Sequence, residues 1–143
     1  MNILSIHNGQ DTGGQSIRIK QAFDRLVPAW SFRSIVNPQT FVYLDYPADL
    51  PWSAAREAWA AADVVHLHND FHTLKMLERG RKPAIMHYHG SAFRLDPFSR
   101  LREQRKRSIA GVVSTLDLLL ISPNELEWLP SPYNLEMLRD LRP

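Results

Sequence analysis

Histidine and carboxylate side chains are concentrated in one short stretch of this 143-residue chain. His66, His68, Asp70 and His72 occupy alternate positions, and imidazole with carboxylate is a donor set that binds zinc. A strand over this stretch would point His66 and His68 to the same face. One interpretation is therefore a small metal-dependent hydrolase that uses this group of residues.

The same residues allow an interpretation without a metal. The run departs by one residue from the His-x-His-x-Asp-His pattern of metallo-β-lactamase-type hydrolases, and further ligands from distant loops would be needed. In this second interpretation His66 is buried under a sheet, while His68 and Asp70 line a cleft or cap the next helix. We favour it, and we expect neither a metal nor any other cofactor.

A second histidine group lies at His87-Tyr-His89-Gly90-Ser91. His89 falls where a strand is expected to end, and Gly90 would let a ligand come close because glycine has no Cβ. A histidine in that position could polarise a leaving group or hold a sugar hydroxyl. The alternative is a loop histidine that is hydrogen-bonded to the backbone.

Glycines mark a third candidate site near the start of the chain. A buried strand is predicted at Asn2–Ile6, and Gly13, Gly14 and Gln15 lie where the chain enters a predicted helix. Backbone N–H groups at such a turn can approach an anion or a sugar. The dinucleotide spacing and the P-loop lysine and hydroxyl are absent, so NAD and ATP are disfavoured. The alternative is that these glycines only turn the chain.

These candidates depend on elements that alternate between strand and helix. Strands are predicted over Asn2–Ile6, Ser31–Val36, Asp63–His68, Ala84–His89, Gly111–Thr115 and Leu118–Ser122. Helices are predicted over Gly14–Leu26, Pro51–Ala62, Phe71–Arg79 and Pro97–Arg107. The alternation predicts an α/β fold, a three-layer doubly wound parallel sheet of the Rossmann-like kind. Ligands bind beyond the carboxyl ends of such strands, so the three candidate groups should meet at one edge.

Composition limits the class of protein. Seventeen Lys and Arg stand against 15 Asp and Glu, a net charge of +2, which does not imply specific nucleic-acid binding. The absence of cysteine excludes disulfides and thiolate metal sites. No apolar stretch approaches the roughly 20 residues of a membrane span, and no signal peptide is recognisable. We expect a cytoplasmic protein with one domain over residues 1–143, in which 128–143 starts an interdomain linker or forms a C-terminal helix.

The motifs, taken in order, resemble one family. The matching segments are Thr12-Gly-Gly-Gln-Ser-Ile17, Ala62-Asp-Val-Val-His-Leu-His68, Ile85-Met-His-Tyr-His-Gly90 and Trp128-Leu-Pro-Ser-Pro-Tyr-Asn134. Together they resemble the N-terminal Rossmann-like domain of retaining, group 1 (glycogen-synthase-like) glycosyltransferases, which is one half of a GT-B fold.

The resemblance implies transfer of a sugar from a nucleotide-diphosphate donor to an acceptor hydroxyl. It places His89 near the transferred sugar as the catalytic residue, and it brings the Gly13–Gly14 loop near the donor diphosphate and the acceptor. His68 and Asp70 would face the acceptor side of the cleft. The full set of implied donor- or acceptor-binding residues is Gly13, Gly14, Gln15, His68, Asp70, Gly90 and Ser91.

The resemblance also implies partners. The family builds its active site between two domains, so a C-terminal GT-B domain or a partner chain is expected, and these 143 residues alone should show little transferase activity. A non-catalytic binding module on the same fold is the alternative. The basic segment Arg100–Arg107 would by resemblance contact an anionic membrane surface, peripherally, with Phe98, Leu101 and Ile109 as its apolar side. A solvated helix face is the other interpretation of that segment.

Overall fold

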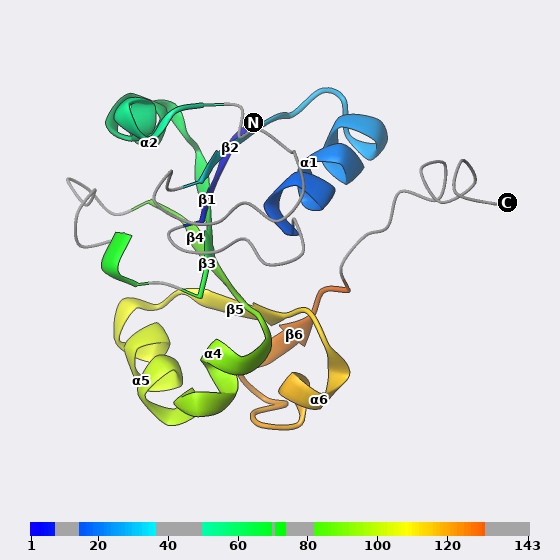
Figure 1. Ribbon diagram of the computed structural model, residues 1–143, viewed down its shortest axis with the longest axis vertical. Helices are drawn as coiled ribbons and strands as arrows, with labels where there is room; N and C mark the ends of the chain where they lie inside the picture. The colour runs from blue at the N-terminus through cyan, green and yellow to red at the C-terminus, as the bar shows by residue number, and fades with distance from the viewer. Residues whose placement is uncertain (8–14, 37–49, 70, 74–81, 131–143) are drawn as a thin grey trace, which may run out of the picture.

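The computed structural model describes residues 1–7, 15–36, 50–69, 71–73 and 82–130. Within these residues strands and helices alternate along the chain (Figure 1). The strands are β1 (Asn2–His7), β2 (Ser31–Val36), β3 (Val64–His68), β4 (Ala84–Tyr88), β5 (Ala110–Val113) and β6 (Leu126–Trp128). The helices are α1 (Gln15–Leu26), the 3-10 helix η1 (Trp52–Ala54), α2 (Ala55–Ala61), α4 (Gly90–Leu95), α5 (Pro97–Arg107) and α6 (Leu116–Leu119).

The strands form one parallel sheet in the order β2-β1-β3-β4-β5-β6. This is an α/β, Rossmann-like arrangement, which confirms the fold class predicted from the sequence. The chain runs from β1 outward to β2 and then returns to β3 on the other side of β1. The strand order therefore reverses between β1 and β3, where doubly wound sheets leave a crevice for a ligand at the carboxyl ends of the strands.

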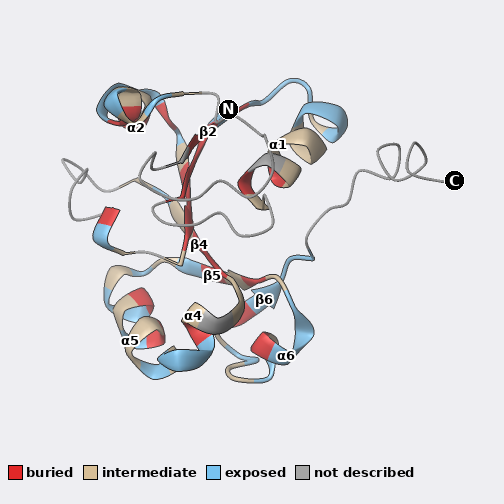
Figure 2. Cartoon of the chain, in the orientation of Figure 1, coloured by how far each residue is buried: buried red, intermediate tan, exposed pale blue. Residues whose placement is uncertain are grey.

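Helices cover both faces of the sheet. α1 packs on one face, where Ile19 joins Ile3 and Phe32 in a small apolar cluster. α2 and α5 pack on the opposite face and contribute Trp59 and Leu101 to the main core. Figure 1 shows α1 and α2 on opposite sides of the strands, and Figure 2 shows the buried residues concentrated along the strands between these layers.

The main core takes alternate residues from the strands. Leu4 lies in register with Val65, and Ile6 with Leu67, so all four side chains point to the face that α2 and α5 cover. Burying an aliphatic side chain of this size stabilises the fold by about 1.5–3 kcal/mol. The same face is continued by Ile35, Met86, Tyr88, Val113 and Leu126.

The opposite face of the same strands is polar toward their carboxyl ends. Ser5 of β1 lies in register with Ser34 of β2 and with His66 of β3, and His68 lies in register with His87 of β4. All five are buried. Buried polar side chains need hydrogen-bond partners, so this row of residues is the part of the fold whose chemistry has to be explained.

Three elements differ from the sequence prediction. The strand predicted at Leu118–Ser122 is wrong: the chain there forms α6 and a turn, because leucine favours helix and Leu118 alone in this helix is buried. The sequence pattern did not predict α4, which has six residues, or β6, which has three and buries only Leu126. The helix predicted at Phe71–Arg79 lies largely outside the described residues.

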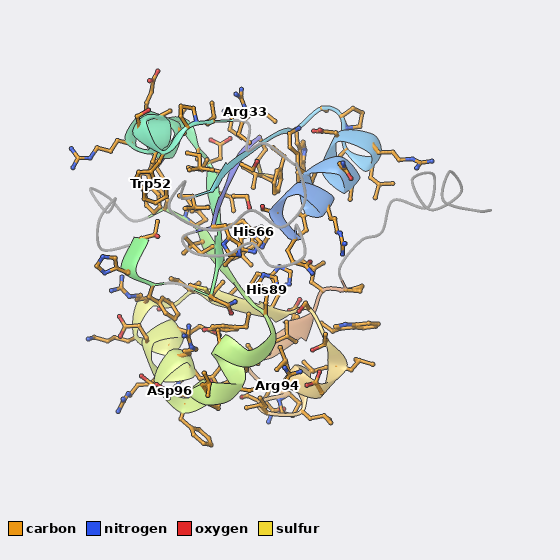
Figure 3. All side chains as sticks on the ribbon, viewed as in Figure 1. Arg33, Trp52, His66, His89, Arg94 and Asp96 are labelled. Atoms are coloured by element: carbon orange, nitrogen blue, oxygen red, sulfur yellow. The ribbon has the colours of Figure 1, made fainter. Side chains whose placement is uncertain are left out.

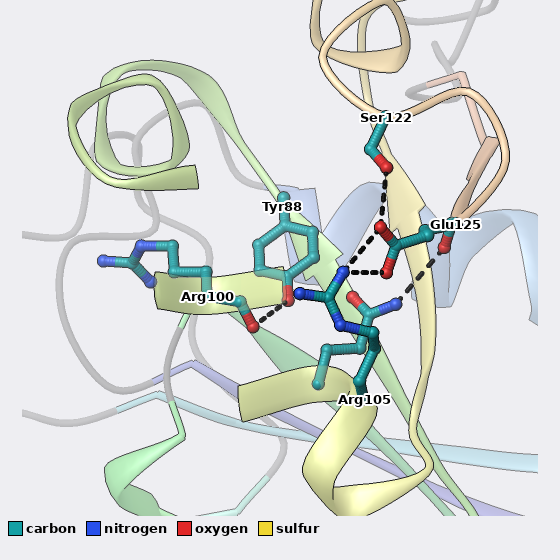
Figure 4. A network of polar contacts seen from close by, with 6 residues as sticks. Tyr88, Arg100, Arg105, Ser122 and Glu125 are labelled. Atoms are coloured by element: carbon teal, nitrogen blue, oxygen red, sulfur yellow. Dashed lines mark hydrogen bonds and ion pairs between the residues drawn. The ribbon is translucent and has the colours of Figure 1, made fainter. Parts of the chain in front are cut away.

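A polar network fixes α5 to the segment that precedes β6 (Figure 4). Arg105 Nη1 contacts both carboxylate oxygens of Glu125, at 2.7 and 2.8 Å, and the Ser122 hydroxyl donates to Glu125 Oε1 at 3.0 Å. Gln104 Nε2 donates to the Glu125 carbonyl at 3.2 Å. The last strand is therefore held by side chains of α5 as well as by its pairing with β5.

Candidate functional site

Five of the six histidines of the chain come together in one group, which we name the histidine cluster. Its members are His7 at the end of β1, His66 and His68 on β3, His87 on β4, and His89 directly after β4. Four are buried and His89 is partly buried. Figure 3 shows His66 and His89 near the middle of the molecule. The predicted meeting at one edge is thus confirmed for the two histidine groups.

Ring nitrogens within the cluster contact one another directly. His66 Nε2 lies 3.2 Å from His87 Nδ1, and His68 Nδ1 lies 2.7 Å from His89 Nε2. Ser5 Oγ lies 3.0 Å from His68 Nε2. A hydrogen bond between two imidazoles needs one N–H and one lone pair, so each pair fixes complementary tautomers.

Burial keeps these imidazoles neutral at pH 7. Burial, and to a smaller extent the charge of nearby His7, lower the pKa of His66 from 6.5 to about 4. Burial, His7 and His66 lower the pKa of His89 to about 3. The pKa values of His68 and His87 are also lowered, first by burial and then by the neighbouring histidines. The cluster therefore offers hydrogen bonds and lone pairs rather than positive charge.

Asn69 joins the loops that follow β3 and β4. Its Oδ1 accepts a hydrogen bond from the His89 backbone N–H at 2.8 Å, and its own N–H donates to the His87 carbonyl at 3.0 Å. Its φ of 55° is a left-handed conformation that asparagine tolerates better than most residues. Arg100 of α5 donates to the Asn69 carbonyl. These contacts fix the positions of His68 and His89 relative to each other.

Gly90 directly follows His89 and begins α4. Its φ is +47°, and no atom of the described residues lies within 4 Å of the position that a Cβ would take. Backbone conformation therefore requires the glycine, whereas crowding does not. The described residues leave that side of Gly90 uncovered, which suits the prediction that a ligand approaches His89 there.

The predicted site residues fall into three groups. His68, His89 and Gly90 lie together at the carboxyl edge of the sheet. Gln15 is the first residue of α1, and Ser91 is the second residue of α4. The remaining predicted residues, Gly13, Gly14 and Asp70, lie outside the described residues.

Sequence reasoning gave no individual role to three residues of this edge, Ser5, His7 and His87, although His7 and His87 lie at strand ends that were expected to meet. The signal that could have found them is their spacing, because alternate residues of a strand share a face. Ser5 and His7 alternate on β1 as His66 and His68 do on β3. The spacing within each strand was visible in the sequence, whereas the register that aligns the strands was not.

Three members of the cluster could hold a metal ion. One ring nitrogen from each of His66, His68 and His87 lies within 4.8 Å of the other two. His72, which the hydrolase interpretation includes, is exposed and does not belong to this group. The structure therefore brings together a different set of histidines from the one that the sequence suggested for a hydrolase.

Comparison with known proteins gives no relative from which a function could be transferred. No family model matches the chain, and no curated protein or solved structure matches it either. The fold class therefore rests on the strand order, and any function has to be inferred from the chemistry of the site.

Proposed function

We propose that this chain is the acceptor-side domain of a retaining glycosyltransferase, which moves a sugar from a nucleotide-diphosphate donor to an acceptor hydroxyl. The observation that carries the proposal is the contact between His68 and His89, whose nitrogens lie 2.7 Å apart at the carboxyl edge of the sheet. The family resemblance gives these two histidines roles at the acceptor and at the transferred sugar. Doubly wound sheets bind their ligands at this edge.

In this proposal His89 acts as a neutral hydrogen-bond partner. Its pKa of about 3 leaves it uncharged at pH 7. Its Nδ1 is buried and has no hydrogen-bond partner among the described residues. A sugar hydroxyl can both donate and accept, so it could satisfy this nitrogen in either tautomer. Because the nitrogen is buried, sugar binding has to open a path to it.

The neutral cluster cannot by itself stabilise a departing diphosphate. The negative charge that develops on such a leaving group needs cations or well-placed N–H donors, and burial disfavours a positive charge on His66, His68, His87 and His89. We therefore propose that a second GT-B domain or a partner chain binds most of the donor diphosphate. The chain alone would bind sugar with little turnover.

The packing of α5 reduces the number of residues that could contact an anionic membrane surface. Leu101 is in the main core and Ile109 packs against it, whereas Phe98 is 78% exposed. Two arginines of this helix are already paired, Arg105 with Glu125 and Arg107 with Glu103. Among the described residues, no helix has the length and hydrophobicity needed to cross a lipid bilayer.

Vesicle binding tests the membrane contact. We expect the chain to bind anionic but not neutral vesicles, and Phe98→Ser to weaken the binding. Equal binding to anionic and neutral vesicles would reject the contact.

Sugar binding tests the main proposal. Isotope-labelled protein is titrated with mono- and disaccharides, and separately with UDP and GDP, while backbone amide NMR signals are followed. We expect sugars to shift the signals of Asn69, His89 and Gly90, and the nucleotides to bind only at millimolar concentration. His89→Ala should abolish the sugar-induced shifts. His72→Ala is the matched control, because His72 is exposed and lies outside the cluster.

The outcomes separate the alternatives. If no sugar shifts these signals, or if His89→Ala binds sugar as the unmodified chain does, the proposed site is wrong. Submicromolar nucleotide binding would contradict the assignment of the diphosphate to another domain or chain. A non-catalytic module would bind sugar but form no labelled product from UDP- or GDP-sugars, even when the second domain or partner is supplied.

A further inference from the structure

Ring nitrogens of the histidine cluster also lie at a spacing that suits a metal ion, independently of any sugar. His66 Nε2 and His87 Nδ1 face each other from neighbouring strands at 3.2 Å. Two nitrogens bound at about 2.0–2.1 Å to a tetrahedral metal ion stand about 3.3 Å apart. One ring nitrogen from each of His66, His68 and His87 lies within 4.8 Å of the other two. We propose that His66, His68 and His87 bind one zinc ion.

Unpaired nitrogens in the cluster are the second observation. His87 Nε2 and His89 Nδ1 are both buried without a hydrogen-bond partner among the described residues, and their rings lie only 4.1 Å apart. Leaving a buried polar group unsatisfied costs folding free energy. Two unsatisfied nitrogens side by side are unusual, because buried polar side chains in folded proteins nearly always have a hydrogen-bond partner. The cluster thus holds hydrogen-bonding capacity that its own members do not use.

His68 lies between two residues that can orient it. Its Nδ1 contacts His89 Nε2, and its Nε2 contacts the Ser5 hydroxyl. A histidine that ligates a metal commonly donates its other ring N–H to a neighbouring acceptor, which fixes the ring and its tautomer. On metal binding His68 would exchange one of these contacts for the ion and keep the other.

The donor set indicates the class of ion. Three imidazole nitrogens favour zinc and its neighbours cobalt, nickel and copper, whereas magnesium and calcium prefer oxygen ligands. Three protein ligands also leave a fourth position for water or for an oxygen of a ligand, which is the arrangement of zinc sites that take part in chemistry. The proposal departs from the expectation of no metal, and its ligands come from β3 and β4 rather than from Asp70 and His72.

Cobalt titration tests the site directly. Metal-stripped protein is titrated with Co²⁺, whose visible absorption reports tetrahedral nitrogen coordination, and Zn²⁺ is then added as a competitor. We expect one equivalent of Co²⁺ to bind and Zn²⁺ to displace it. His66→Gln and His87→Gln should each lower the affinity by more than about 100-fold, and Ser5→Ala, which removes an orienting contact, by about 10-fold. His72→Gln should bind as the unmodified chain does.

A second measurement covers variants that fail to fold. In the unmodified chain, ¹⁵N-labelled imidazole signals should shift on Zn²⁺ addition for His66, His68 and His87 and stay in place for His72. The proposal is overturned if neither metal binds saturably, if His87→Gln binds as tightly as the unmodified chain, or if the shifted signals belong to His72. The readout contains no sugar, so its failure leaves the glycosyltransferase proposal standing.

Discussion

Mild acid should weaken this fold because the histidine cluster is buried in its neutral form. In the unfolded chain a histidine takes up a proton near its ordinary pKa of 6.5, whereas folded His66 does so only near pH 4. Between these two values the unfolded state binds more protons than the folded state. Lowering the pH through this window therefore shifts the equilibrium toward unfolding, and the stability is fully present only above about pH 7.

The size of the effect follows from the shift at His66. One pKa unit corresponds to about 1.36 kcal/mol, so this histidine alone removes about 2 kcal/mol of unfolding free energy between pH 7 and pH 5, and about 3 kcal/mol by pH 4. His89, with a pKa of about 3, adds a loss of the same sign. Because the pKa values of His66, His68, His87 and His89 are all lowered, the figure for His66 alone is a lower bound on the loss. Small domains are stable by only about 5–15 kcal/mol, which makes such a loss easy to measure.

Urea denaturation at several pH values, in the presence of a chelator, measures this loss. The four tryptophans provide the fluorescence signal. His66→Gln removes one titrating group, so the unfolding free energy of this variant should depend less steeply on pH, whatever its value at pH 7. His72→Gln, at an exposed histidine outside the cluster, should keep the slope of the unmodified chain.

The result at pH 5 decides the matter. If the unfolding free energy of the unmodified chain changes by less than about 0.5 kcal/mol between pH 7 and pH 5, the cluster is not buried in neutral form as described. If the unfolding free energy of His66→Gln depends on pH as steeply as that of the unmodified chain, the acid sensitivity comes from groups other than His66. Carboxylates titrate mainly below this range, which is why the comparison is made above pH 5.

Three further predictions concern the framework of the site, each measured by urea denaturation at pH 7. Gly111→Ala should destabilise the fold by about 1–3 kcal/mol, because the added Cβ would lie 2.3 Å from Gln104 Oε1. Adding Gln104→Ala should recover part of that loss. An unchanged stability in Gly111→Ala would show that β5 and α5 pack less closely than described. Asn69→Ala should lower the unfolding free energy by about 1–2 kcal/mol, because alanine tolerates a φ of 55° poorly and loses the contact with the His89 N–H. Asn69→Gly should lower it by less, because glycine adopts this φ without strain. A larger loss in Asn69→Gly than in Asn69→Ala would contradict the strain argument. Arg105→Gln should lower the unfolding free energy by less than about 1 kcal/mol despite the two contacts of Arg105 with Glu125, since the Arg105 side chain is 59% exposed. A larger loss would mean that the network stabilises the fold more than an exposed ion pair does.

The sequence predicted best those elements that carry strong local signals. The predicted bounds of α5 and β2 match the structure. α5 begins with Pro97 after Asp96, whose side chain accepts a hydrogen bond from the Ser99 N–H, which is a standard helix start. α4 and β6 lack such signals because they are short and bury few side chains, and their conformation is set by packing against the sheet.

The sequence predicted which residues of a strand share a face and that the strand ends meet at one edge, but it did not predict which residues of neighbouring strands contact each other. His66 and His68 were expected to share a face, and they do. The contact of His66 with His87 depends on the parallel register of β3 and β4, which no pattern within either segment determines. The same limit explains why Ser5, far away in the sequence, was not counted with the histidines.

The two proposals use different atoms of one cluster, and His68 links them. Sugar binding would use His89, whereas zinc would bind His66, His68 and His87, and the 2.7 Å contact between His68 and His89 joins the two sets. Whether His68 keeps its contact with His89 or exchanges that contact for the ion, zinc binding acts on the ring that contacts His89, so the metal should change the affinity for sugar. Thermodynamic linkage requires sugar to change the affinity for zinc by the same factor. A zinc-loaded chain that binds sugar as the metal-free chain does would mean that the ion and the sugar act independently, whereas reciprocal changes would join them in one site.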